Sequence, residues 1–299
     1  MKLWQKKQSA HEKIDHFTVG RDREYDLVLA AYDCTASIAH AKMLSKIGLL
    51  TEKESQTLTT ELEALKTSAE ASNFVIEDDF EDMHSKIEFV LTEKLGDLGK
   101  KIHTARSRND QVLVAIHLYL KKEISEIKSL SLDFFNLLME LAENHQNDLM
   151  PGYTHFQVAM PSSFGLWFSA YAESLIDDLT LLNAAQKIVD QNPMGSAAGY
   201  GSSFPIDREE TTQLMAFSDL KYNVMAAQMS RGKAEKITAT GIAGVSATLA
   251  KLAMDICLYM SQEFNFITFP DNLTTGSSIM PHKKNPDVFE LIRGKCNLL

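Results

Sequence analysis

One segment determines the fold class: KKIHTARSRNDQVLVAIHLYLKKEISEIKSLSLDFFNLLMELAENHQNDLM, residues 100–150. It contains neither glycine nor proline. Apolar residues recur through it in steps of three and four, interrupted only by Ser131: Leu113, Ile116, Leu120, Ile124, Ile127, Phe134, Leu138 and Leu141. This period predicts one amphipathic helix from Asp110 to Leu149, about 60 Å long. The helix is expected to end where Pro151 and Gly152 follow.

Further helix signals lie on both sides of this segment. Two long helices are predicted near Ser162–Asp190 and Gly232–Phe264. The second carries ATGIAGVSATLA, whose small residues suit close packing of helices. Thr51 and Asp207 each precede a glutamate by three residues, which is the spacing of a capping box at a helix start.

Long helices bury their apolar stripes against similar partners, and strand-like alternation is hard to find in this sequence. The predicted fold is therefore all-α, an elongated bundle of long helices. We expect a smaller, mainly helical N-terminal domain over residues 1–105 and the bundle domain over residues 106–299.

Composition excludes several classes of protein. The 299 residues carry a formal net charge of −10, which argues against nonspecific binding to nucleic acid. The basic N-terminus has no apolar run after it, so it is not a secretory signal, and no run of about 18 apolar residues suggests a membrane span. The three cysteines, Cys34, Cys257 and Cys296, are interpreted as reduced thiols of a cytoplasmic protein.

Two stretches partly match known cofactor or metal motifs, but neither has the required spacing. HEKIDH places His11 and His16 five residues apart, so they would not share a helix face as zinc ligands do. GYGSSF, residues 199–204, lacks the third glycine of a dinucleotide-binding turn. We therefore expect chemistry that needs neither a cofactor nor a metal.

The last 24 residues, GSSIMPHKKNPDVFELIRGKCNLL from Gly276, combine features that matter together. A Gly-Ser-Ser run alone is usually a linker, and Asn285-Pro286 alone is an ordinary helix start. A helix N-terminus attracts anions, however, and Lys283 and Lys284 add positive charge beside it. The combination predicts a carboxylate site on a mobile loop.

Three other stretches could carry chemistry. HTARSRNDQV, residues 103–112, is either a well-capped helix start or a planar clamp for anions. MPGYTHFQVAMP, residues 150–161, presents a threonine and a histidine on a tight connector, suited either to structural hydrogen bonding or to acid/base work. EDMHSKIE, residues 81–88, is most simply a charged helix surface.

Together these stretches resemble the argininosuccinate lyase family, within the fumarase/aspartase superfamily. GSSIMPHKKNP resembles the superfamily signature, and TARSRNDQV resembles the motif of the argininosuccinate branch. GYTHFQ and EDMHSKIE fall where the family has its Thr-His and early His motifs. The resemblance implies a cytoplasmic lyase of arginine biosynthesis, without cofactor, that splits argininosuccinate into arginine and fumarate by anti β-elimination. It also implies a homotetramer with composite sites.

The resemblance assigns roles to individual residues. Ser277 matches the proposed base, His155 the second acid/base group and Glu290 the carboxylate that orients it. Lys283 matches a residue that stabilises negative charge on the substrate carboxylate. The positions matching substrate-binding residues are Ser107, Arg108, Asn109, Thr154, Arg231, Asn285, Asp82 and His84.

Some positions depart from the family pattern. His282 stands where the family commonly has glutamine; a histidine at this position also occurs in the adenylosuccinate branch. Ala105 replaces a common glycine, and Gly232 replaces a common aspartate. Because the family continues well beyond Leu299, this chain is expected to be a truncated piece with little or no activity alone. Two alternatives stay open: an adenylosuccinate lyase-like enzyme, and a non-enzymatic, crystallin-like structural protein.

Overall fold

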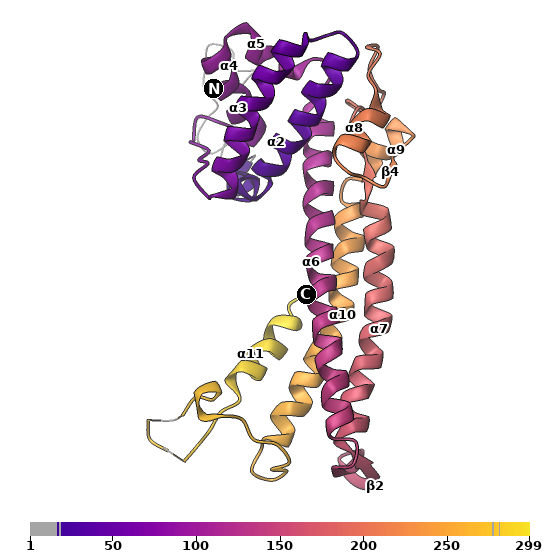
Figure 1. Cartoon of the computed structure of the whole chain (residues 1–299). Helices are drawn as coiled ribbons and strands as arrows, with labels where there is room; N and C mark the ends of the chain where they lie inside the picture. Colours follow the sequence, from indigo (N-terminus) through magenta and orange to yellow (C-terminus); the bar gives the residue numbers. More distant parts are fainter. Residues whose placement is uncertain (1–16, 18, 277, 281) are drawn as a thin grey trace. The chain divides into compact units, whose positions relative to one another are not determined.

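The computed structural model describes residue 17 and residues 19–276, 278–280 and 282–299. Its contacts divide the chain into two compact units. The first comprises the described residues up to Lys122 with Lys187–Ala234, and the second comprises Glu123–Gln186 with Glu235–Leu299. Helices dominate each unit (Figure 1), so the all-α prediction is confirmed. The predicted domain boundary near residue 105 stays a prediction.

The first unit is built around the pair α2 and α3. Its elements are α2 (Asp22–Lys46), α3 (Glu52–Glu70), α4 (Met83–Leu95), α5 (Asp97–Lys100), the 3-10 turn η1 (Lys101–His103), the start of α6, α8 (Arg208–Leu214), α9 (Val224–Met229), and the paired short strands β3 (Gln191–Asn192) and β4 (Asp219–Leu220). Leu58, Leu62 and Met83 are among the fully buried side chains of its core. The helix starts predicted at Thr51 and Asp207 are those of α3 and α8, where each side chain accepts from the N–H three residues on. At Thr51 the reciprocal bond from Glu54 completes a capping box.

The second unit contains three long helices lying side by side (Figure 1). Its elements are the rest of α6 (Arg108–Asn144), the hairpin strands β1 (Leu149–Thr154) and β2 (Gln157–Ser163), α7 (Phe164–Val189), α10 (Lys233–Tyr259), the 3-10 turn η2 (Asp271–Leu273) and α11 (Asp287–Cys296). Leu138 of α6, Leu175 of α7 and Leu252 of α10 meet in one buried cluster. The three long helices predicted from apolar period are confirmed.

The predicted end of α6 is wrong. The helix stops at Asn144 rather than Leu149, and Leu149 instead begins β1. The turn after Asn144 uses its carbonyl groups elsewhere: His145 O accepts from Gly165 N and Asp148 O accepts from Phe164 N, both at 3.0 Å. The first N–H groups of α7 have no partner within that helix, and these bonds satisfy two of them, which favours the turn over a continued α6. Ser131, which interrupts the apolar stripe, is buried with its hydroxyl donating to Ile127 O at 2.7 Å.

The small residues of α10 allow the close packing that was predicted. A Cβ added at Gly241 would lie 3.0 Å from Leu182 Cδ2, and one at Gly244 would lie 2.9 Å from Asp178 Oδ1. Among the described residues, α10 also has the length and composition of a membrane-crossing helix, which was not expected from the sequence. Its apolar stretch is 39% buried, and Val245 belongs to the buried cluster of the bundle.

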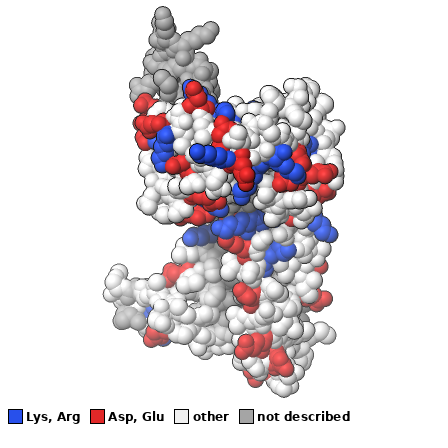
Figure 2. Space-filling model, turned by 45° about the horizontal axis from the view of Figure 1, so that its top comes forward, with Lys and Arg blue, Asp and Glu red and all other residues white. Residues whose placement is uncertain are grey.

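Charged side chains of both signs are interspersed over the face drawn in Figure 2. Among the described residues, ion pairs join Lys46 with Glu210 at 2.6 Å and Lys94 with Glu61 at 2.7 Å.

Candidate active site

The N-terminus of α4 anchors the first group of predicted site residues. Asp82 caps the helix, with Oδ1 accepting from Ser85 N at 2.8 Å. Its other oxygen, Oδ2, accepts from Arg108 Nη1, which also donates to Ser85 Oγ at 3.1 Å. Burial alone would raise the pKa of Asp82, but His84 and Arg108 outweigh it and hold that pKa below its usual value. Asp82 therefore stays ionised and fixes one edge of the Arg108 guanidinium.

The start of α6 positions Ser107 and Asn109. Asn109 donates to Ser107 Oγ from its backbone N–H at 3.3 Å and from Nδ2 at 3.2 Å. Ser107 N donates in turn to Asp110 Oδ1 at 2.9 Å. Asp110 is fully buried, and its Oδ2 accepts from Gly195 N and Ala197 N, both at 3.0 Å. The ordinary interpretation, a well-capped helix start, is thus right for Asp110.

Next to this start the first unit has an open cleft. The residues lining it include three of the predicted site residues, and together they are Glu81, Asp82, Ser85, His103, Arg106, Ser107 and Arg108. Carboxylate, hydroxyl and guanidinium groups face one another here. Such a set can bind a small molecule that carries both an anionic and a cationic end.

His84 lies behind the cleft wall. Its Nδ1 is 3.0 Å from Asp33 Oδ1, and both side chains are nearly inaccessible to solvent. Burial would raise the pKa of Asp33, but the charges of His84, Arg106 and Arg108 bring that pKa below its usual value. The substrate-binding role expected for His84 stays a prediction.

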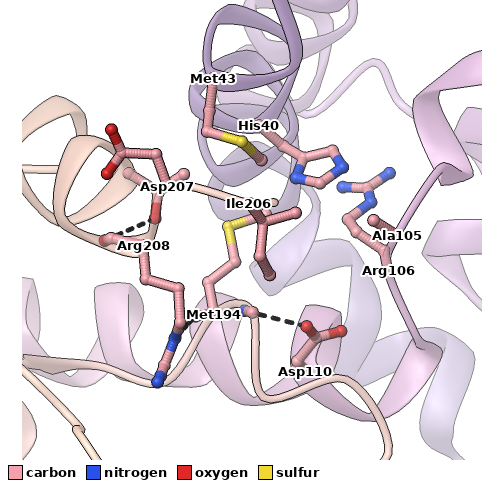
Figure 3. Close-up of a pocket in the computed structure, with 11 residues that line it drawn as sticks. His40, Met43, Ala105, Arg106, Asp110, Met194, Ile206, Asp207 and Arg208 are labelled. Carbon is pink, nitrogen blue, oxygen red and sulfur yellow. Dashed lines mark hydrogen bonds between the residues drawn. The ribbon is translucent and has the colours of Figure 1, made fainter. Parts of the chain in front are cut away.

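A second, smaller pocket also has Arg106 in its lining (Figure 3). Figure 3 shows His40 and Arg106 near each other at one end of it, and Arg208 and Asp110 at another. The Arg208 guanidinium donates to three backbone carbonyls, Met194 O and Lys221 O at 2.8 Å and Tyr222 O at 3.1 Å. Three of its five N–H groups are therefore bound to the backbone, and Arg208 links the segments that carry these carbonyls.

The backbone conformation bears on two departures from the family pattern: it favours the glycine at 232 and disfavours the alanine at 105. Gly232 has φ +75, in the left-handed region that glycine adopts without strain, whereas aspartate is tolerated there less readily. Ala105 also lies in that region, with φ +59, where a glycine would suit the backbone better. Arg231, between α9 and α10, is exposed, and its N–H donates to Gln228 O at 3.3 Å.

In the second unit, Thr154 and His155 lie at the tip of the β1–β2 hairpin. Thr154 pairs with Gln157, so His155 and Phe156 form a two-residue turn. Both turn residues have positive φ, 52 and 58, as in type I′ turns. Thr154 and His155 are exposed. The tight connector predicted here is present, but the strands on either side of it were not foreseen.

Lys283, Asn285 and Glu290 line one open cleft of the second unit, together with His282, Lys284, Pro286, Met280 and the C-terminal end of α10. Asn285 exchanges backbone hydrogen bonds with Thr275, at 2.8 and 3.3 Å, which ties the loop back on itself. Lys284 pairs with Asp271, while Lys283 is exposed and has no ion-pair partner among the described residues. Helix α11 begins at Asp287 after Pro286, one residue later than predicted. Ser277, the predicted base, lies outside the described residues.

Sequence reasoning missed several polar residues that support these clefts. Arg106, Asp110 and Asp33 were not selected, although the first two belong to a motif that was. Their importance follows from their contacts. Buried Asp110 accepts from Ser107 N, Arg106 donates to Ser37 of α2, and buried Asp33 lies 3.0 Å from His84. A signal was present in YDCTASIAHAKML, where polar residues alternate with small apolar ones along α2.

Comparison with known proteins gives consistent results. A family model described as lyase matches residues 7–298. Argininosuccinate lyases of Phocaeicola vulgatus and Parabacteroides distasonis are each 56% identical over 298 residues, covering 100% of this chain and 67% of theirs. The structure of an EDDS lyase in complex with formate matches with a TM-score of 0.81 and 24% identity, over 98% of this chain and 57% of that one. The chain spans about two thirds of the length of the curated relatives.

Proposed function

This chain belongs to the lyase family, and because its relatives over its whole length are argininosuccinate lyases, we propose that it splits argininosuccinate into arginine and fumarate by anti β-elimination. The observation that carries this proposal is the 56% identity over 298 residues. The proposal includes a small-molecule substrate, a cytoplasmic location, and chemistry without a cofactor.

The chemistry required by this reaction suits the cleft of the second unit. A proton must leave a carbon next to a carboxylate, so negative charge grows on that carboxylate in the transition state. Lys283 and Asn285 would stabilise this charge, and the N-terminus of α11 adds its dipole. Ser277 would be the base, with His155 and Glu290 forming the second acid/base pair. A serine can act as a base only if its alkoxide is stabilised, which nearby lysines favour.

The cleft of the first unit suits substrate binding. Asp82 and Ser85 hold the Nη1 edge of Arg108, and among the described residues Nη2 makes no hydrogen bond. That edge could bind a substrate carboxylate, with Ser107 and Asn109 beside it as further donors. Roles for Thr154, Arg231 and His84 in binding are proposed on the resemblance alone.

We also propose that the protein works as a homo-oligomer, a homotetramer with composite sites. Helix α6 has 37 residues, which corresponds to about 55 Å at its usual rise. Asn109 is the second residue of this helix, and His155 follows its other end. A small substrate spans only a fraction of that length, so the two residues would serve one site only if they came from different chains. Exposed apolar side chains on the long helices, such as Leu130 at 69% and Ile176 at 51%, are suited to contacts between chains.

The activity is tested by following fumarate release through its ultraviolet absorbance, using the full-length protein with argininosuccinate and, separately, with adenylosuccinate. Turnover of about 1 per second or more on argininosuccinate supports the proposal. Turnover on adenylosuccinate alone, or on neither substrate, overturns it. The 299 residues by themselves are expected to show little activity.

A further inference from the structure

Helix α2 carries a buried polar stripe, defined by Asp33, Ser37 and His40. Their spacing of four and three residues places them on one helix face. Their relative exposures are 1%, 1% and 2%, on a helix whose other buried residues are mostly small and apolar. Burying polar groups is unfavourable unless they have partners, so the partners show what the stripe does.

Each member of the stripe contacts a segment that carries proposed site residues. His40 Nε2 donates to Thr104 O at 2.8 Å. Because a carbonyl only accepts, this bond requires the neutral ring to carry its hydrogen on Nε2. Ser37 Oγ accepts from Arg106 Nη1 at 2.8 Å. Asp33 faces His84, at the start of α4, at 3.0 Å.

The residue between the two anchored positions is under conformational strain. Ala105 has φ +59, a conformation unfavourable for any residue with a Cβ, and it persists only where its surroundings hold it. His40 holds the residue before it and Ser37 the residue after it. The next residues along the chain are Ser107 and Arg108, which line the open cleft.

The His40 contact is insensitive to pH in the ordinary range. Burial, together with the nearby positive charge of Arg106, holds the pKa of His40 well below its usual value. The ring therefore stays neutral, and the donor to Thr104 O is kept. Figure 3 shows His40 directed toward the Arg106 side of the small pocket.

We propose that Ser37 and His40 are positioning residues, which hold Thr104 and Arg106 so that Ser107, Arg108 and Asn109 present their donors to the substrate. The inference rests on the proposed lyase function for the identity of that substrate. The alternative is that the stripe only stabilises the packing of α2 against the segment. The two differ in what is lost: positioning affects substrate binding, whereas packing affects the stability of the whole unit.

The test uses Ser37→Ala and His40→Leu in the full-length protein, with His40→Gln as the conservative variant, since its amide can also donate to Thr104 O. Thr35→Val is the matched control, because the Thr35 hydroxyl donates only within α2, to Ala31 O at 3.0 Å. Three quantities are measured: KM and kcat for fumarate release, amide hydrogen exchange of the peptide over residues 103–112, and the melting temperature.

We expect KM to rise by roughly 10-fold or more in Ser37→Ala and His40→Leu, as for loss of one charge-assisted or buried hydrogen bond. We expect kcat to change much less, and exchange to quicken in the 103–112 peptide alone. His40→Gln should recover most of the wild-type KM, and Thr35→Val should match wild type. An unchanged KM, or exchange that rises throughout the unit with a lower melting temperature, refutes positioning. If the wild type releases no fumarate, the proposed function fails, and the exchange data still decide whether the stripe holds this segment.

Discussion

Replacing Asp110 with alanine is expected to remove three hydrogen bonds from the start of α6. Its carboxylate accepts from Ser107 N at 2.9 Å and from Gly195 N and Ala197 N at 3.0 Å. Asp110 is fully buried, so water cannot easily take its place. A buried donor left without a partner costs about 1–3 kcal/mol, and three such donors, two of them only partly buried, imply a loss of about 3–6 kcal/mol. That is a large share of the roughly 5–15 kcal/mol by which a typical domain is stable.

The free energy of unfolding is measured by urea denaturation, followed by far-ultraviolet circular dichroism. Asp110→Asn keeps one acceptor oxygen, so it should lose about half as much as alanine. Asp133→Ala, on the exposed surface of the same helix, is the matched control and should change stability by no more than about 0.5 kcal/mol. A loss below about 1 kcal/mol in Asp110→Ala, or equal losses in the alanine and asparagine variants, would refute the reasoning.

Four further predictions concern the chemistry, the assembly, the packing and the pH response. Ser277→Ala in the full-length protein should reduce kcat below about a tenth of wild type while substrate still binds, because a base acts in the transition state; a higher kcat excludes it as the base. Mixing subunits that carry Asn109→Ala with subunits that carry His155→Ala should partly restore fumarate release if sites are shared between chains, and no recovery means that each site lies within one chain. Gly241→Ala should destabilise the protein, because the added Cβ would lie 3.0 Å from Leu182 Cδ2. Gly294 lies in α11 with open space around it, so Gly294→Ala should stabilise the protein by up to about 1 kcal/mol. Urea denaturation compares the two variants. The pKa values of Asp82 and Asp33 are lowered in the folded state. Their stabilising effect is therefore present above about pH 4 and is lost as the pH falls through their folded pKa values. Arg108→Gln should make the acid unfolding curve less steep, and an unchanged curve contradicts the assignment.

The helices were predictable because their signals are local. The period of α6 and the glutamate three residues after Thr51 lie within a few turns of chain, and the structure confirms both. The hairpin was not predictable in the same way. Its strands include Pro151 and Pro161, and most of β2 is exposed, so no buried alternation marks it. The end of α6 was missed because it depends on bonds to the start of α7, which are not visible along one helix.

The groups that carry the proposed chemistry were found by motif, but their support was not. Asp33, Ser37 and His40 are spaced as one helix face in the sequence, yet their partners lie far along the chain. His40 and Ser37 contact Thr104 and Arg106, more than sixty residues away, and Asp33 contacts His84. The spacing alone could equally describe a polar surface stripe. What separates the two interpretations is burial, because a polar face that is closed to water must have partners. Here the partners of Ser37 and His40 belong to the segment that carries Ser107–Asn109, and that of Asp33 lies at the start of α4. Polar residues at helical spacing among small apolar ones therefore indicate, from the sequence alone, that the helix face binds another segment of the chain.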